Sequence, residues 1–172
     1  MIMRYLNIFG LTVAIAICTH QPLQAIQLAD GTSYFAEPPS LVKAVTTFRN
    51  PSVPATYYFT VSLPENAGVP LQSVTFKQRE GLEEVPFDGA EAEIAGKNQH
   101  LSLKMNDHQT VSVTFDPPVA PGQTIKIGLH AINPYYGGIY LFGVTAFPVG
   151  EKSHGQFLGF GTLQFSTPGG RF

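Results

Sequence analysis

The sequence has one cysteine, no tryptophan and no run of basic residues. Cys18 is the single thiol and lies near the N-terminus, so thiol catalysis and a disulfide framework are excluded for the remainder of the chain. Ten Lys and Arg stand against 12 Asp and Glu, which gives a net charge of -2. Nucleic-acid backbones attract clustered positive charge, so the composition argues against a nucleic-acid partner.

Short motifs that mark common catalytic and metal sites are also missing. The sequence contains no GxSxG nucleophile motif, no HExxH or CxxC metal motif, and no His-x-His pair. We therefore predict a non-catalytic domain without a cofactor. A metal-binding protein or hydrolase of the cell envelope remains an alternative, with Glu84 and Glu91 as one pair of carboxylates for glycoside hydrolysis.

The N-terminus has the pattern of a secretory signal peptide. Residues 8–18 form an apolar run that is shorter than the roughly 20 residues needed to span a bilayer as a helix. Ala25 supplies a small residue for cleavage, which predicts a signal peptide at residues 1–25 and a mature domain at residues 26–172. We expect a secreted, periplasmic or cell-envelope protein with no stable transmembrane span after cleavage.

Apolar and polar residues alternate with a period of two along much of the remaining chain. In residues 56–63, Tyr57, Phe59 and Val61 share one face and hydroxyl-bearing residues share the other. This pattern predicts an all-β fold, an antiparallel β-sandwich with an immunoglobulin-like Greek key in a single domain. Residues 40–46 are expected to form a short helical turn. A small outer-membrane β-barrel is the alternative architecture. The same alternation recurs in residues 74–77, 101–105, 110–115 and 124–131.

Two later segments, residues 139–148 and 157–165, are apolar on both faces. Such strands are either covered on both faces or form an exposed apolar surface that favours association. Gly143, Gly159 and Gly161 interrupt them, which predicts bulges or close backbone approach at these positions.

The runs YLFGVTAFP and GQFLGFG, with the earlier YYFTVSLPENAGVPLQSVTFKQREG, resemble a family of exported cyanobacterial proteins classed as a domain of unknown function. The resemblance covers nearly all of the mature chain. It implies export, an immunoglobulin-like sandwich and no catalytic residues. One departure is Thr162, which stands where a basic residue usually follows GFG in that family.

A loop rich in tyrosine, proline and glycine is the strongest candidate for binding. We predict that Asn133, Tyr135, Tyr136 and Tyr140 contact an envelope or extracellular protein or a glycan, because tyrosine combines apolar area with a hydroxyl group. The lack of tryptophan weakens the glycan version. The alternative is that Tyr135 and Tyr136 only cover the end of the core.

Six carboxylates lie close together in residues 80–93. Asp88, Glu91 and Glu93 form a weak calcium candidate, because calcium prefers oxygen ligands. An acidic loop that keeps a sheet edge solvated is the commoner arrangement.

The histidines of the mature chain show no spacing typical of metal ligands, and we expect them to be solvent-exposed. They are His100, His108, His130 and His154.

Overall fold

The computed structural model describes residues 26–27, 30–106 and 110–169. The predicted signal peptide therefore lies outside the described residues, as does His108. All regular elements in the described part are strands. Within it there is no helix with the length and apolar character needed to cross a membrane.

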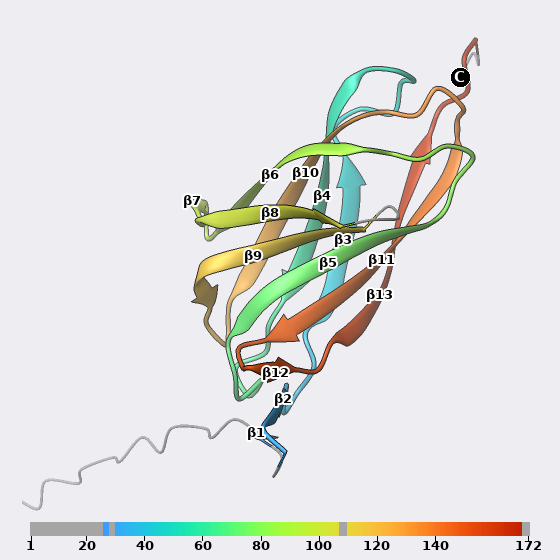
Figure 1. The fold of residues 1–172 in the computed structure, drawn as a ribbon. Coiled ribbons are helices and arrows are strands. Elements are labelled where there is room, and N and C mark those ends of the chain that lie inside the picture. Colours follow the sequence, from blue (N-terminus) through green and yellow to red (C-terminus); the bar gives the residue numbers. More distant parts are fainter. Residues whose placement is uncertain (1–25, 28–29, 107–109, 170–172) are drawn as a thin grey trace, which may run out of the picture.

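Two five-stranded sheets pack face to face, and each is antiparallel throughout (Figure 1). The first sheet has the order β3-β4-β10-β6-β7 and the second has the order β13-β11-β5-β9-β8. The strands of the first sheet are β3 (Ser40–Thr46), β4 (Pro54–Ser62), β6 (Phe87–Ile94), β7 (Lys97–Asn98) and β10 (Thr124–Ile132). Those of the second are β5 (Leu71–Glu80), β8 (Leu101–Asn106), β9 (Thr110–Val119), β11 (Gly138–Pro148) and β13 (Gln156–Phe165).

A small third sheet lies at one end of the sandwich, at the bottom of Figure 1. Its strands are β1 (Ile26–Gln27), β2 (Thr32–Tyr34) and β12 (Lys152–Ser153). The β3–β4, β5–β6 and β10–β11 loops lie together at the other end, which we name the loop end (Figure 1). The N-terminal strand and the loop end are thus on opposite sides of the domain.

The strand order is that of an immunoglobulin domain, in which one sheet runs A-B-E-D and the other G-F-C. If β3, β4, β5 and β6 are strands A to D, and β10, β11 and β13 are strands E to G, both orders are reproduced. The β8–β9 hairpin is inserted between D and E and extends the second sheet beside C. The predicted immunoglobulin-like sandwich is therefore confirmed.

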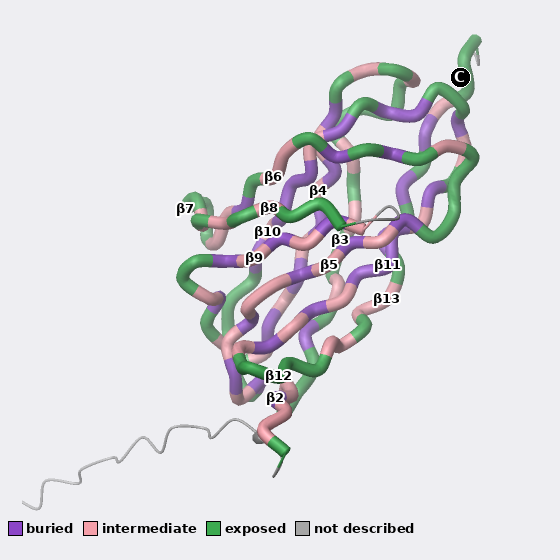
Figure 2. Tube along the Cα trace, in the orientation of Figure 1, coloured by how far each residue is buried: buried purple, intermediate pink, exposed green. Residues whose placement is uncertain are grey.

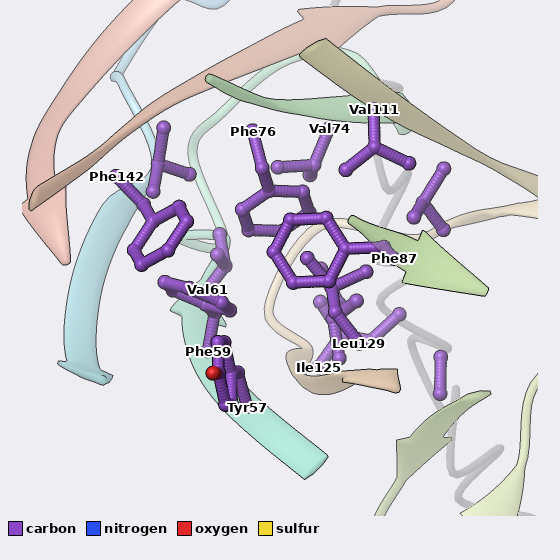
Figure 3. Close-up of a cluster of buried hydrophobic side chains, with 14 of the residues drawn as sticks. Tyr57, Phe59, Val61, Val74, Phe76, Phe87, Val111, Ile125, Leu129 and Phe142 are labelled. Atoms are coloured by element: carbon purple, nitrogen blue, oxygen red, sulfur yellow. The ribbon is translucent and has the colours of Figure 1, made fainter. Parts of the chain in front are cut away.

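Aromatic side chains fill the space between the sheets (Figure 3). Tyr57 and Phe59 of β4 lie 6.0 and 6.1 Å from Phe142 of β11, measured between ring centroids. Phe76 of β5 lies 4.6 Å from Phe59, and all four side chains are fully buried. Since β4 and β11 correspond to strands B and F, these rings occupy the region where antibody domains place their disulfide. A cysteine-free core is thus held by aromatic packing.

Two sequence predictions are wrong because regular strands replace irregular segments. Residues 40–46 form strand β3, which pairs with β4, rather than a helical turn. A register shift between Leu41 and Lys43 interrupts its alternation and hides the strand pattern. The acidic segment is a loop only at residues 81–86, because Glu80 is the last residue of β5 and Phe87–Ile94 form strand β6, which pairs with β10.

The glycines of β13 behave as predicted. Gly159 has a φ of +111° beside a register shift in the β11–β13 pairing, which is a bulge. At Gly161 a Cβ atom would lie 2.4 Å from the ring of Phe59, so only glycine allows this approach between the sheets. Gly143 instead keeps a regular ladder position, opposite Phe160.

Candidate binding site at the loop end

Asn133 ties the end of β10 to the β3–β4 loop. Its side chain is 2% exposed. The amide oxygen accepts a hydrogen bond of 3.0 Å from the Tyr57 hydroxyl, and the amide nitrogen donates to the carbonyls of Phe48 (3.0 Å) and Asn50 (2.9 Å). The Asn133 backbone N–H donates to the Val53 carbonyl at 2.9 Å. Asn133 is therefore buried beneath the loops, where it holds their backbone in place and cannot contact a binding partner.

Tyr140 supports the β10–β11 loop from the start of β11. Its side chain is fully buried, and its hydroxyl donates to the Tyr136 carbonyl at 2.9 Å. A tyrosine at the start of strand F that bonds back to the preceding loop is the tyrosine corner of immunoglobulin domains. The ring lies against Gly81, where a Cβ atom would be 2.2 Å from Tyr140 Cδ1. Tyr140 thus joins the β10–β11 loop to the β5–β6 loop.

The backbone on either side of the loop tip is fixed by neighbouring segments. The Glu83 carboxylate accepts a hydrogen bond from the Tyr136 N–H. Gly137 packs against the backbone of Ser166, whose carbonyl carbon would lie 2.4 Å from a Cβ atom at Gly137. The Ser166 N–H in turn donates to the Arg49 carbonyl at 2.8 Å. The loop is therefore held by the β3–β4 loop, the β5–β6 loop and the segment after β13.

Tyr135 and Tyr136 are the exposed members of the predicted site. Their side chains are 53% and 56% exposed, and their rings pack edge to face with centroids 5.3 Å apart. The structure thus divides the four predicted residues into two that face solvent and two that hold them. We name Tyr135 and Tyr136 the tyrosine pair.

Leu82 and Phe48 were not identified from the sequence, although they are 77% and 56% exposed at the same end. Phe48 lines a shallow groove of about 520 Å³ on the outer face of the first sheet, with Ile132, Asp88 and His130. The signal that was available is an apolar residue inside a loop segment, and it is weak because single exposed apolar residues are common. The loop end thus presents apolar side chains beyond the tyrosine pair.

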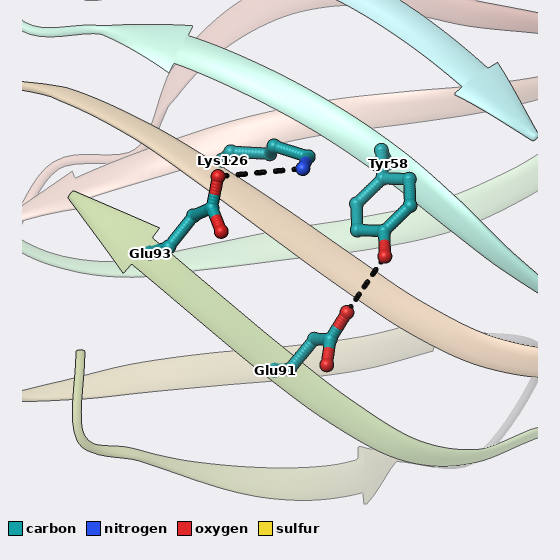
Figure 4. A network of polar contacts seen from close by, with 4 residues as sticks. All are labelled: Tyr58, Glu91, Glu93 and Lys126. Atoms are coloured by element: carbon teal, nitrogen blue, oxygen red, sulfur yellow. Dashed lines mark hydrogen bonds and ion pairs between the residues drawn. The ribbon is translucent and has the colours of Figure 1, made fainter. Parts of the chain in front are cut away.

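Two of the three calcium-candidate carboxylates form cross-strand contacts instead (Figure 4). Glu91 accepts a hydrogen bond of 2.8 Å from the Tyr58 hydroxyl, which is the main cause of the raised pKa of Tyr58. Glu93 lies 3.3 Å from the ammonium of Lys126, and that ammonium sits 4.2 Å from the centre of the Tyr58 ring. These contacts reach across β10 and link β4 to β6.

Asp88, the third candidate, is exposed at a register shift between β6 and β10. No three or more His, Cys, Asp and Glu side chains gather to hold a metal ion anywhere in the described ranges. Asp88, Glu91 and Glu93 therefore do not form such a group.

The described histidines lie apart in the fold. His130 is partly exposed, with its Nε2 atom 3.8 Å from a Glu91 oxygen, and His154 stacks on Tyr34 with ring centroids 4.7 Å apart. His100 is exposed just before β8. They act here as surface and packing residues.

The buried tyrosines predict a loss of stability at high pH. Burial raises the pKa of Tyr57, and nearby Tyr140 adds to this rise; burial and then Glu83 raise the pKa of Tyr140. Unfolded tyrosine ionises near pH 10, so above that pH the unfolded chain releases protons that the folded chain retains. The free energy of unfolding should therefore fall as pH rises above about 10, by at most about 1.4 kcal/mol per pH unit for each tyrosine.

Urea unfolding between pH 8 and 11 measures this slope. Tyr57→Phe is expected to make this slope shallower, because it removes one of the two buried tyrosines. Equal slopes for wild type and Tyr57→Phe would show that Tyr57 ionises as readily in the folded chain.

An immunoglobulin-like β-sandwich with exposed aromatic side chains at its loop end is the class of protein that these observations define. The chain belongs to the family described as "Protein of unknown function (DUF2808)", whose family model matches residues 32–165. This confirms membership of a family of unknown function, as the sequence resemblance indicated. Among curated proteins, none matches the sequence.

Three solved structures share the fold. The N-terminal domain of the Streptococcus gordonii adhesin Sgo0707 has a TM-score of 0.52 at 15% identity, over 77% of this chain and 33% of the adhesin chain. BcpA, the major pilin subunit of Bacillus cereus, gives 0.51 at 10% identity, over 76% of this chain and 41% of the pilin. SpaD, the full-length major pilin of Corynebacterium diphtheriae, gives 0.51 at 12% identity, over 73% and 33%. This chain thus matches well under half of each of those chains, and at these identities the likeness shows the fold alone.

Proposed function

We infer that this protein is a non-catalytic domain of the cell envelope or cell exterior that binds another protein through its loop end. The observation that carries this inference is the tyrosine pair, which is exposed on a backbone already fixed by hydrogen bonds and close packing. Tyrosine side chains have two rotatable angles, so they lose little entropy when a partner covers them. A rigid loop avoids the further cost of ordering its backbone on binding.

The fold and the predicted signal peptide support this role. An immunoglobulin-like sandwich displays its loops at the ends of a stable core, where variation in sequence does not disturb the sheets. Adhesin and pilin chains contain domains of the same fold, which supports a location at the cell surface. Strand β1 lies at the opposite end of the domain from the β10–β11 loop (Figure 1), so it does not cover the tyrosine pair.

Site-specific photo-crosslinking in intact cells tests the proposal. A photo-reactive phenylalanine analogue replaces Tyr136 in one variant and Met105 in the control, since Met105 has a similar exposure of 55% but lies on the edge strand β8. The analogue at position 136 is expected to yield one discrete protein adduct that the control lacks. Adding Tyr135→Ala is expected to reduce that adduct about tenfold, as removal of a central aromatic contact does.

A melting temperature of the Tyr135→Ala variant equal to that of wild type shows that the fold is intact. The same adducts at positions 136 and 105, or an adduct insensitive to Tyr135→Ala, would contradict binding through the tyrosine pair.

A further inference from the structure

The outer face of the second sheet carries an apolar strip along β11 and β13. Ile139 is 60% exposed and Phe160 is 51% exposed, because alternate residues of these strands point away from the core. Leu141 lies between them and is half-buried. Phe157, 48% exposed, packs edge to face against Phe160 with ring centroids 5.2 Å apart. The two-sided apolar pattern of these strands thus produces an exposed apolar surface, one of the two outcomes expected from the sequence.

Pairing between the strands sets the order of the apolar side chains along the strip. Ile139 and Leu141 follow each other on the outer face of β11, and the next outward position, Gly143, is opposite Phe160 on β13. Gly143 has no side chain, and the space above it is covered by Phe157 and by the side chain of Arg79. The Arg79 side chain thus lies over Gly143, and the polar residues Gln164 and Thr162 of β13 lie opposite Ile139 and Leu141. The strip therefore consists of two apolar groups, Ile139 with Leu141 and Phe157 with Phe160.

Charges beside the strip change sign along its length. Near its middle, Lys77 of β5 is opposite Gly143, and the Arg79 Nε atom would lie 3.4 Å from a Cβ atom at Gly143. Toward the loop end, Glu80 is opposite Leu141, and Glu83 bonds to the Tyr136 N–H. One end of the strip is therefore acidic and its middle is basic.

We propose that this strip is the interface of a symmetric dimer formed by two copies of this chain. A two-fold axis through the strip lays two copies antiparallel, so that apolar side chains cover apolar side chains. The same axis sets Glu80 of one copy against Lys77 and Arg79 of the other, twice per dimer, as a self-complementary interface requires.

The dimensions suit an ordinary interface. Ile139 and Gly143 are four residues apart on β11, which is roughly 13 Å at about 3.3 Å per residue. A stable interface of about 800 Å² per partner is wide enough to include both charged regions. The dimer contact uses the face of the second sheet, so it goes beyond the proposed function and does not depend on the tyrosine pair binding another protein.

Sedimentation velocity of the purified protein from about 1 µM to about 1 mM tests the dimer. Wild type is expected to show reversible dimerisation, and Phe157→Ser with Phe160→Ser is expected to raise the dissociation constant at least about tenfold. Met105→Ser is the control, because it removes an exposed apolar side chain from β8, the opposite edge of the same sheet. Wild type that stays monomeric throughout, or a double serine variant that dimerises like wild type, would overturn the proposal.

The charge pairing has its own test. Arg79→Glu is expected to weaken the dimer about tenfold at low salt, and the difference from wild type is expected to shrink at high salt because ions screen exposed charges. An unchanged dimer would contradict the two-fold arrangement. Tyr135→Ala with Tyr136→Ala is expected to dimerise normally, so loss of the crosslinked partner and loss of the dimer are separate results.

Discussion

Replacing Phe142 by alanine is expected to lower the free energy of unfolding by about 3–5 kcal/mol. Phe142 is fully buried and touches the rings of Tyr57, Phe59 and Phe87, so the substitution removes packing between both sheets and leaves a cavity. Domains of this size have roughly 5–15 kcal/mol of stability, so the loss is a large share of the total. Urea denaturation of the variant and wild type measures it.

Phe48→Ala is the matched control, because the same side chain is removed from an exposed position at the loop end. We expect it to change the free energy of unfolding by less than about 0.5 kcal/mol. Similar losses for the two variants would show that Phe142 does not occupy a packed core.

Asn133→Ala is expected to lower the free energy of unfolding by about 3 kcal/mol, because it removes three hydrogen bonds at a buried position. It also leaves the Tyr57 hydroxyl and the carbonyls of Phe48 and Asn50 without that partner. Tyr57→Phe removes only one of these bonds and should cost about 1 kcal/mol. Urea denaturation at neutral pH measures both losses in the free energy of unfolding.

Asn133→Ala is also expected to make the β3–β4 loop more mobile. Amide hydrogen exchange at Ser52, whose N–H donates to the Asn133 carbonyl, should quicken in Asn133→Ala more than the change in global stability explains. If Asn133→Ala and Tyr57→Phe lowered the free energy of unfolding equally, the hydrogen bonds from the Asn133 amide to the two loop carbonyls would not stabilise the fold.

Strands with strong alternation were predictable from the sequence. In β4 the inward residues Tyr57, Phe59 and Val61 are large and apolar, and the structure buries all three. Strand β6 was missed because Ala90 and Ala92, in the middle of its inward face, are small and its outward residues are charged or glycine. Its large inward residues, Phe87 and Ile94, lie only at its two ends. Such a strand can be identified only from its pairing with β10. Local periodicity in the sequence does not show which distant segments pair.

The candidate site was only half predictable for a related reason. Composition identifies Tyr135 and Tyr136 as a loop tip, but the burial of Tyr140 depends on the phase of β11, in which Tyr140 and Phe142 face inward together. Glu83 is 53 residues away from Tyr136, so its hydrogen bond follows from tertiary packing. For the same reason Glu91, a ligand candidate by composition, is instead a partner of Tyr58.

Backbone ¹⁵N relaxation of Tyr135 and Tyr136 tests most directly whether the loop end is a pre-formed contact surface. Order parameters of about 0.85, equal to those of the flanking strands, are the expected result, because the Tyr136 N–H donates to Glu83 and the Tyr136 carbonyl accepts from Tyr140. Values below about 0.6 in the free protein would contradict it, because the tyrosine pair would then sit on a flexible loop.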